Sequence, residues 1–345
     1  FVLFIHQKID FIGKNLMIFY RTKKEEDPYY KLWKTEKWLF PIENAAKFDF
    51  PMTVSVEVTN RCSSNCLFCS RRLMQRVEGD MSMDCVEKII MESSKHDAAV
   101  RHGGWGETLL HPQIEDIIEM SKKWNVLTTI FTNGFPLTEN MAKSFIKSGL
   151  DEIRFSTTGF TEDQHNHIRK GSDYQRDIVE KIKMVHKLKK EMKSNKPYLT
   201  LYATVLNYDD ENFIANIDKY SKYFLNYVDK VDVDLTNFSR VKLLHQAKEH
   251  YTKQSIVQEY KPCVDLFLKL IVHWNGDFFV CDEPYNFDET YFLGNINKGQ
   301  KIEDGWKSKK MQKFRNDLAF QSNHANYNLC KDCFANTTKW DIKSY

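Results

Sequence analysis

The sequence predicts an α/β protein in which an open, mostly parallel sheet of six βα repeats is followed by a smaller C-terminal domain. Between residues 53 and 235, short β-rich runs alternate with amphipathic helical stretches, which is the pattern of βα units. Six repeats are too few to close an eight-stranded barrel, so we expect a partial (βα)6 barrel. Its ligands should lie at the carboxyl ends of the strands.

The expected elements follow this alternation along the chain. The six strands are expected at residues 53–58, 98–102, 126–131, 152–156, 198–205 and 230–235. Helical periodicity is clearest over residues 83–95, 113–124 and 173–190. Residues 1–50 are rich in aromatic and charged residues, with Pro28 and Pro41 as breakers. We expect an N-terminal arm over residues 1–50, the barrel over 51–240 and the C-terminal domain over 241–345.

Composition excludes several classes of protein. The 345 residues include 50 Lys plus Arg against 47 Asp plus Glu, and this near balance predicts no nucleic-acid partner. Eight cysteines in so long a chain indicate metal ligation in a reducing compartment, so we expect a cytoplasmic location. The apolar start of the chain is interrupted by His6, Lys8 and Asp10, which predicts no membrane span.

Three cysteines, Cys62, Cys66 and Cys69, form a C-x3-C-x2-C array directly after the first expected strand. A tight loop with this spacing can wrap three thiolates around three corners of a [4Fe-4S] cube and leave the fourth iron open. The alternative, a structural zinc knuckle, usually needs paired C-x2-C units with a fourth ligand nearby. The array resembles the cluster loop of the radical S-adenosylmethionine (radical SAM) superfamily. That resemblance implies a radical SAM barrel fold and reductive cleavage of SAM to a 5′-deoxyadenosyl radical.

The resemblance also implies a set of SAM contacts. Phe68 occupies the position of an aromatic residue that lies beside the adenine. Residues 103–108, Gly-Gly-Trp-Gly-Glu-Thr, resemble the GGEP motif of the family, although Thr108 replaces the proline. The SAM-binding residues implied are Phe68, Gly104, Gly106, Glu107, Asn133, Ser156, Thr157, Arg169 and Asn207. For the residues at strand ends, ordinary turn and cap chemistry is the competing interpretation.

A second cysteine set follows the sixth expected strand and comprises Cys263, Cys281, Cys330 and Cys333. It resembles the twitch domain, a short relative of the SPASM domain, and this implies one auxiliary [4Fe-4S] cluster and two clusters in all. Structural zinc remains the alternative for four thiolates. Asn275 and Gly276 between two apolar runs predict a two-residue hairpin turn. The segment before residue 266 must then bend back to bring the first of these cysteines level with the second.

The remaining predictions concern the eighth cysteine and the reaction. Cys85 falls in a helical stretch, where a free cysteine is commonly a small buried hydrophobe. The resemblance implies a radical SAM oxidoreductase of the dehydrogenase type, which oxidises a sugar-like or aminocyclitol alcohol and passes the second electron to the auxiliary cluster. Arg240 is the candidate proton acceptor, with His245, Asp232 and Asp234 as alternatives.

Two other classes of function stay open at this stage. The first is a peptide maturase that crosslinks or epimerises its substrate, although epimerisation usually needs a spare cysteine as hydrogen-atom donor. The second is a non-catalytic metal-binding scaffold that has lost SAM chemistry. The expected partners are therefore a small-molecule or peptide substrate and an electron donor such as flavodoxin or ferredoxin.

Overall fold

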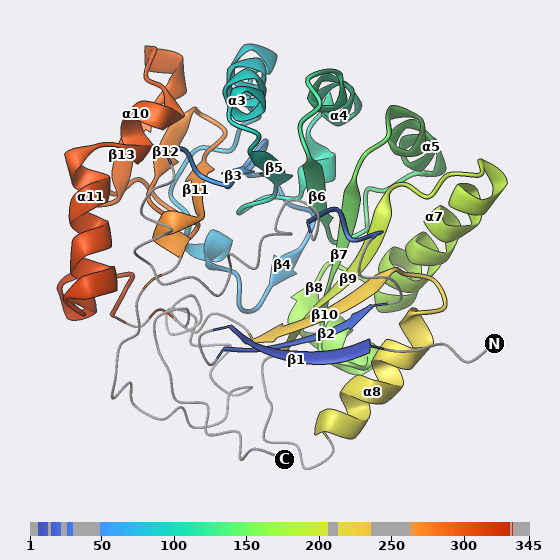
Figure 1. The fold of residues 1–345 in the computed structure, drawn as a ribbon. Coiled ribbons are helices and arrows are strands. Elements are labelled where there is room, and N and C mark those ends of the chain that lie inside the picture. The colour runs from blue at the N-terminus through green and yellow to red at the C-terminus, as the bar shows by residue number, and fades with distance from the viewer. Residues whose placement is uncertain are drawn as a thin grey trace.

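The computed structural model describes residues 6–12, 15–21, 26–29, 49–205, 213–235, 263, 265–331 and 333. Within these ranges eleven strands form one sheet in the order β1-β2-β10-β9-β7-β6-β5-β3-β11-β12-β13. The strands follow one another around an arc, and the helices α3, α4, α5, α7 and α8 lie along its outer side (Figure 1). The predicted partial barrel is therefore confirmed.

The centre of the sheet consists of six strands that pair in parallel and in sequence order. These strands are β3 (Thr53–Val56), β5 (Ala99–His102), β6 (Thr128–Thr132), β7 (Glu152–Thr158), β9 (Tyr198–Val205) and β10 (Lys230–Leu235). Each overlaps a strand predicted from the sequence. Strands that follow one another in the chain thus lie side by side and parallel, which is the arrangement that right-handed βα repeats produce.

Each of the three predicted helical stretches, 83–95, 113–124 and 173–190, contains a helix. The helices are α3 (Met83–Lys95), α4 (Ile114–Lys123), α5 (Glu139–Ser148), α6 (Glu162–Ile168), α7 (Glu180–Glu191) and α8 (Phe213–Phe224), with α10 (Ile302–Trp306) and α11 (Lys309–Arg315) in the C-terminal region. The predicted helix over residues 173–190 begins as a π-helical turn, η5 (Tyr174–Val179). Among the described residues, no helix is long and apolar enough to cross a membrane.

Short helical turns fill several of the connections. They are η3 (Ser70–Leu73), η4 (Thr108–Leu110), η7 (Asp265–Phe267), η8 (Ile296–Lys298), η9 (Asn316–Phe320) and η10 (His324–Asn326). Polar caps define the ends of the longer helices, as at α5, where the Thr138 side chain accepts a hydrogen bond from the backbone N–H of Met141. Gly149 ends α5 in the left-handed conformation, which glycine adopts without the strain of a Cβ.

The two faces of the central strands differ in chemistry. On β7, Ile153 and Phe155 are fully buried in the hydrophobic core that the helices cover. The residues that alternate with them, Glu152, Arg154 and Ser156, point to the opposite face, because successive side chains of a strand alternate. We call this polar side of the sheet the inner face. It is the side on which the barrel can hold ligands.

Both edges of the six-stranded centre are extended by further strands. At one edge, β10 pairs with the hairpin of β1 (His6–Ile12) and β2 (Asn15–Arg21). This hairpin was not predicted from the sequence, which indicated only an N-terminal arm over residues 1–50. At the other edge, β3 pairs in parallel with β11 (Lys269–Val272), which continues into β12 (Asp277–Phe279) and β13 (Phe292–Asn295). Each addition satisfies the backbone groups that an open edge would leave unpaired.

The predicted hairpin between β11 and β12 is present, but its turn differs from the predicted two-residue type. The backbone N–H of Gly276 donates to the carbonyl of His273 at 2.8 Å, and the N–H of His273 donates to the carbonyl of Asp277 at 2.7 Å. Trp274 and Asn275 are thus the central residues, and Gly276 follows with φ +85°. This is a turn with a glycine bulge, in which the left-handed position falls one residue later than in the tighter hairpin.

Candidate functional site

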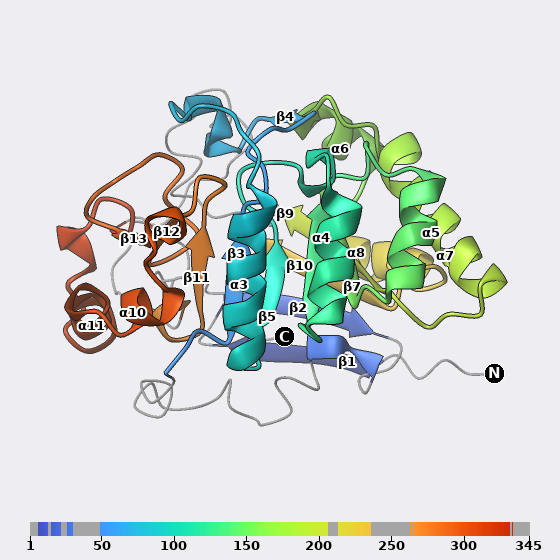
Figure 2. The same ribbon diagram turned by 90° about the horizontal axis from the view of Figure 1, so that it is seen from above.

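The C-x3-C-x2-C loop leaves the carboxyl end of β3 and is tied to the segment that follows α6. Within the loop, β4 (Asn65–Cys66) pairs antiparallel with β8 (Arg169–Lys170), so Cys66 lies opposite Arg169. The N–H of Leu67 donates to the carbonyl of Ile168 at 2.9 Å. Figure 2 shows β4 and α6 together at one end of the barrel. The loop therefore lies over the strand ends, where parallel barrels place their ligands.

The three cysteines of this loop lie in a poorly solvated environment. Cys66 is buried, and Cys62 and Cys69 are partly buried. Burial raises the pKa of the Cys62 thiol to about 12, and the Glu107 carboxylate adds to the shift. Burial raises the pKa of Cys66 to about 11, although the Arg169 charge opposes it. Such thiols lose their protons when a metal takes the proton's place, so the donor set fits an iron–sulfur cluster.

Glu107 braces the cysteine loop from the next strand. Its carboxylate accepts hydrogen bonds from the Thr132 hydroxyl and the Asn133 N–H, both at 2.7 Å, and from the Leu109 N–H at 3.2 Å. Its backbone N–H donates to the carbonyl of Arg61 at 2.7 Å. Burial raises the pKa of Glu107 to about 7 despite these donors. The side chain therefore joins the ends of β5 and β6, and the backbone N–H ties them to the segment that leads into the cysteine loop.

Asn133 links the end of β6 to the same loop. Its side-chain N–H group donates to the Ser64 hydroxyl at 2.8 Å and to the Ser63 hydroxyl at 3.2 Å. The glycines of residues 103–108 also allow close packing next to this loop. A Cβ on Gly106 would lie 2.0 Å from the carbonyl oxygen of Thr59, so only glycine lets these backbones approach. Gly104 has φ +145°, a conformation that other residues rarely adopt.

Arg169 and Phe68 meet beside the loop. The guanidinium of Arg169 lies over the Phe68 ring, 5.4 Å from its centroid. The same guanidinium donates to the Thr158 hydroxyl at 2.8 Å and to the Thr157 carbonyl at 3.2 Å. Arg169 is buried, so it is a fixed positive charge beside the cysteines rather than a surface cation. Both residues implied by the family resemblance thus lie within one cluster of contacts.

Ser156 and Thr157 at the end of β7 face opposite sides of the sheet. The Thr157 hydroxyl forms a 2.9 Å hydrogen bond with the hydroxyl of Tyr220 on α8. Ser156 alternates with it and shares the inner face with Arg154. Of the two hydroxyls, only that of Ser156 is directed to the ligand side. A contact between Thr157 and a ligand in the barrel would need its backbone.

Some candidates lie outside the described residues. These are Asn207, implied as a SAM contact, together with Arg240 and His245, named as proton acceptors. The side chain of Asp234 is likewise outside the described part. Asp232 is described: it lies on the inner face of β10, fully buried, and forms an ion pair with Arg154. Of the named acceptors, it is the one the structure places in the barrel.

The second cysteine set comes together from three separate segments. The N–H of Cys263 donates to the carbonyl of Leu318 at 3.1 Å, and η7 then turns the chain into β11, which provides the expected bend. Burial raises the pKa of Cys281, and the charges of Cys330 and Cys333 add to it. Burial and then the charge of Cys263 raise the pKa of Cys330. Charge effects of this kind act over several ångströms, so they place the four thiols in one region of the structure. The eighth cysteine, Cys85, is buried in the hydrophobic core.

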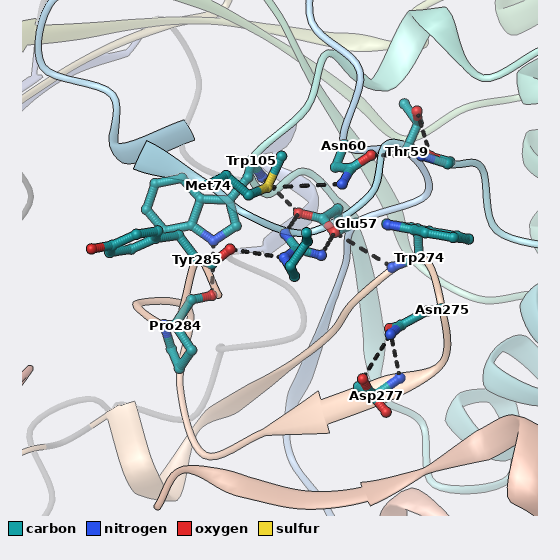
Figure 3. Close-up of polar contacts among 12 residues, drawn as sticks. Glu57, Thr59, Asn60, Met74, Trp105, Trp274, Asn275, Asp277, Pro284 and Tyr285 are labelled. Atoms are coloured by element: carbon teal, nitrogen blue, oxygen red, sulfur yellow. Dashed lines mark hydrogen bonds and ion pairs between the residues drawn. The ribbon is translucent and has the colours of Figure 1, made fainter. Parts of the chain in front are cut away.

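A buried ion pair lies where the C-terminal region meets the first cysteine loop (Figure 3). The two guanidinium N–H groups of Arg76 donate to the two carboxylate oxygens of Glu57, at 2.7 and 2.8 Å. Arg76 also donates to the carbonyl of Tyr285 at 2.8 Å. The carboxylate further accepts the N–H of Trp105 at 3.2 Å and that of Trp274 at 3.5 Å. One carboxylate therefore joins the segments before and after the first cysteine set to the β11–β12 turn.

The indole of Trp105 adds a second connection at this junction. Its Nε1–H donates to the carbonyl of Pro284 at 3.0 Å, three residues after Cys281. The ring also meets that of Tyr285 edge to face, with centroids 5.8 Å apart. In the sequence, Trp105 is one residue of the glycine-rich segment 103–108. Its position in the motif gave no signal of this contact, because the partner lies 179 residues away.

The inner face carries a polar network that sequence reasoning did not single out. Glu152 accepts hydrogen bonds from the hydroxyls of Thr200 at 2.6 Å and Thr129 at 2.9 Å. Arg154 pairs with Asp232, and its guanidinium also lies 4.0 Å from the Glu152 carboxylate. The sequence does contain a sign of this network. Strands of parallel sheets are usually apolar throughout, whereas polar and apolar residues alternate in these strands. Polar alternation in such a strand indicates a ligand-facing side.

Comparisons with known proteins bear on both halves of the chain. A family model described as the radical SAM superfamily matches residues 56–252, which is more than half of the chain. A second model, described as an iron–sulfur cluster-binding domain, matches residues 263–334. The two matches divide the two cysteine sets between them.

Individual proteins are similar over different lengths. The chain is 27% identical over 317 residues to the tungsten-containing aldehyde ferredoxin oxidoreductase cofactor-modifying protein of Pyrococcus furiosus. This match covers 81% of this chain and 86% of the relative. The chain is 24% identical over 113 residues to the PqqA peptide cyclase of Gluconobacter oxydans, about a third of each protein (32% of both).

Two solved structures share the fold at low identity. BtrN in complex with AdoMet and 2-DOIA superposes with a TM-score of 0.52 at 17% identity, over 82% of this chain and 92% of BtrN. Streptococcus suis SuiB bound to S-adenosylmethionine superposes with a TM-score of 0.56 at 13% identity, over 85% of this chain and 74% of SuiB. At these identities the likeness concerns the fold alone.

Proposed function

The chain belongs to the radical SAM superfamily, and from this membership we propose that it oxidises an alcohol of a small molecule after reductive cleavage of SAM. The protein binds [4Fe-4S] clusters and SAM, and its C-terminal region is an iron–sulfur cluster-binding domain. We assign the SAM-binding cluster to Cys62, Cys66 and Cys69. We assign one auxiliary cluster to the four C-terminal cysteines, because four thiolates complete one cube.

The observation that carries the proposal is the pair of cysteine sites held on one sheet and joined by the Glu57–Arg76 ion pair. When bound, the clusters and SAM would supply one-electron cleavage of SAM, abstraction of a hydrogen atom from the substrate and an acceptor for the second electron. The protein's own residues hold the first cysteine loop over the strand ends and direct polar groups at the inner face. The alcohol proton needs an acceptor, and Asp232 is the described candidate on that face.

SAM binding is proposed for the residues around the first loop. Phe68 offers its ring for the adenine, with Arg169 on the ring face as a fixed positive charge. Asn133 and Ser156 supply polar groups at the ends of β6 and β7. Gly104 and Gly106 keep the motif backbone close to the cysteine loop, so that backbone carbonyls are near the ligand. Glu107 is proposed to position this backbone, because three donors of the chain occupy its carboxylate.

One feature favours a small molecule over a peptide. The relative from Pyrococcus furiosus, which matches 81% of this chain, is named for modifying a cofactor. A peptide maturase remains the second candidate, supported by the 24% identity to the PqqA peptide cyclase over 113 residues.

Iron and sulfide content, measured with 5′-deoxyadenosine formation under anaerobic conditions, tests the proposal. Wild type should hold about eight irons, and a Cys62→Ala/Cys66→Ala/Cys69→Ala variant about four with no turnover. Cys85→Ala is the matched control and should keep about eight irons, since this thiol lies in the core. Wild type with about four irons and active turnover would rule out the auxiliary cluster and the oxidation that depends on it.

A further inference from the structure

Arg101 lies in the middle of the barrel on β5, the strand that leads into the glycine motif. It pairs with Ser55 of β3 on one side and with Thr129 of β6 on the other. Gly103 follows two residues later on the same face, about 7 Å further along the strand at the usual rise per residue. A group held by Arg101 would therefore lie just below the level at which SAM is proposed to bind.

Other cations on the described strands of the inner face are paired with carboxylates. Arg154 pairs with Asp232, as described above. Lys269 lies 3.1 Å from Asp265 and 3.0 Å from Asp282. By contrast, no ion pair or hydrogen bond joins the guanidinium of Arg101 to any of the described residues.

Lys230 is also paired with carboxylates. Its ammonium lies 3.1 Å from Asp232 and 3.6 Å from Asp27, a buried residue of the N-terminal arm. Arg76 at the cysteine junction is likewise held by Glu57. Within the described part of the inner face, Arg101 thus stands apart as a cation that no described carboxylate pairs with.

Aromatic stacking fixes the orientation of Arg101. Its guanidinium carbon lies 4.9 Å from the centroid of the Phe131 ring. A Cβ on Gly103 would come within 3.2 Å of that ring, so the glycine leaves room for it. Stacking engages the flat face of a guanidinium and leaves the N–H groups at its edge free to bind a carboxylate or phosphate in a fork. Arg101 is partly exposed, so a dissolved ligand can reach it.

We propose that Arg101 anchors an anionic group of the substrate, a carboxylate or a phosphate, on the inner face of the barrel. This inference rests on the proposed function and narrows its substrate class. A substrate that presents an ammonium group at this place would meet the guanidinium charge of Arg101, so the site selects an acid over an aminocyclitol.

Ligand-observed fluorine NMR on the anaerobically reconstituted, SAM-loaded holoenzyme tests this assignment. The probes are 4-fluorobenzoate, 4-fluorophenyl phosphate and 4-fluorobenzylammonium, which share a ring and differ in charge. At low ionic strength the two anions should bind wild type more tightly than the cation does. Arg101→Gln should weaken anion binding at least tenfold, and Arg101→Lys should give an intermediate affinity, because it keeps the charge but loses the fork.

Arg176→Gln is the matched control, because this guanidinium also stacks on a phenylalanine, 5.3 Å from the Phe135 ring centroid, but is paired with Asp177. It should leave anion affinity unchanged. The anion that binds more tightly identifies the group as carboxylate or phosphate. Equal anion affinity in wild type and Arg101→Gln, an equal loss in Arg176→Gln, or tighter binding of the cation would overturn the proposal.

Two further measurements keep the outcome interpretable. Circular dichroism establishes that Arg101→Gln is folded; if it is not, Arg101→Lys and the contrast between anion and cation in wild type decide the question. Formation of 5′-deoxyadenosine by wild type is assayed separately. Failure of that assay with intact anion binding would sink the proposed function, whereas turnover without selective anion binding would sink only the role of Arg101.

Discussion

The two cysteine regions are built in opposite ways. The first set lies within residues 62–69, and hydrogen bonds from Glu107 and Asn133 hold its loop to the strand ends. The second set spans residues 263–333 and gathers three distant segments. The first region therefore depends on a few polar braces, and the second depends on the packing of a whole subdomain.

Aromatic side chains form the support of the second region. The rings of Phe314 and Tyr327 lie 4.6 Å apart, and those of Tyr291 and Phe314 lie 5.6 Å apart. The Tyr291 hydroxyl accepts the N–H of Leu329 at 3.0 Å, next to Cys330. Trp306 on α10 is almost fully buried. Apolar packing is cooperative, so a defect anywhere in this core should disturb all four cysteines.

The largest effect is expected from removing the indole at the centre of that core. Trp306→Ala should destabilise the protein by about 3–5 kcal/mol, since truncation of a buried tryptophan leaves a cavity. Arg315, which stacks 4.2 Å from the indole centroid, would also lose its support. Thermal unfolding and iron content check this, with about four irons lost and the SAM cluster kept.

The control for this change is Trp124→Ala at the end of α4, where the indole is 37% exposed. It should cost far less stability and leave the iron content unchanged. If both variants lose about four irons, the auxiliary site is sensitive to general destabilisation rather than to its own core.

The next effect concerns the polar braces of the first region. Glu107→Gln places an amide N–H₂ where the carboxylate now accepts the Thr132 hydroxyl and two backbone N–H groups. One donor would then face another donor, and loss of a hydrogen bond to a charged group costs about 1.5–3 kcal/mol. We expect at least a tenfold loss of 5′-deoxyadenosine formation with the auxiliary irons retained.

An exposed carboxylate of α4, Glu119, provides the comparison for that variant. Glu119→Gln should leave turnover and iron content as in wild type. Unchanged turnover in Glu107→Gln would mean that the loop is held by the backbone contacts alone. Loss of the auxiliary irons in Glu107→Gln would remove the contrast between the two regions.

A smaller effect should appear on acidification at the junction between the regions. Burial lowers the pKa of His273 to about 4, although the Glu57 carboxylate acts in the opposite direction. The unfolded chain then binds a proton below about pH 6.5 that the folded state excludes, so stability is complete above that pH and falls as the pH drops toward 4. At pH 5.5 the loss is about 1.4 kcal/mol.

Replacing this histidine separates its contribution from the rest. His273→Phe should reduce the difference in melting temperature between pH 7.5 and pH 5.5, and the neighbouring Phe279 ring, 4.6 Å away, can pack against the new ring. His167→Phe is the exposed counterpart and should leave that difference as in wild type. An unaltered acid response in the His273 variant would assign the sensitivity to other groups.

The smallest effect is expected at the surface of the first region. Arg71 pairs with Glu78, whose side chain is 53% exposed. Solvent-exposed ion pairs contribute about 0–1 kcal/mol, so Glu78→Gln should change the free energy of unfolding by less than about 0.5 kcal/mol. Chemical denaturation measures this value. A loss as large as that of Glu107→Gln would show that surface charges, rather than buried braces, hold the loop.

Much of the local structure could be predicted from the sequence. The six central strands and α3 appear where periodicity placed them, because hydrophobic periodicity is a property of neighbouring residues. The first cysteine set, eight residues long, was recognisable for the same reason. The hairpin at Asn275 and Gly276 was also predicted, but its turn type depends on which residue adopts positive φ, and that is decided by the register of the flanking strands.

Other features depend on contacts between residues far apart in the chain. The face on which Ser156 and Thr157 lie, the bonding of Trp105 to Pro284 and the pairing of β3 with β11 follow from strand register and sheet order. The absence of a described carboxylate beside Arg101 likewise depends on contacts between distant residues. No local pattern encodes which charges are neutralised across a sheet.

The sequence by itself therefore determined the fold class, the positions of the βα units and the spacing of the cysteines, because each is a periodicity or a spacing within the chain. Tertiary structure decided which polar groups brace the first cysteine loop and how the four distant thiols converge. It also decided which cation of the inner face has no carboxylate partner among the described residues. These depend on distances between segments separated by tens to hundreds of residues, which only the folded chain brings together.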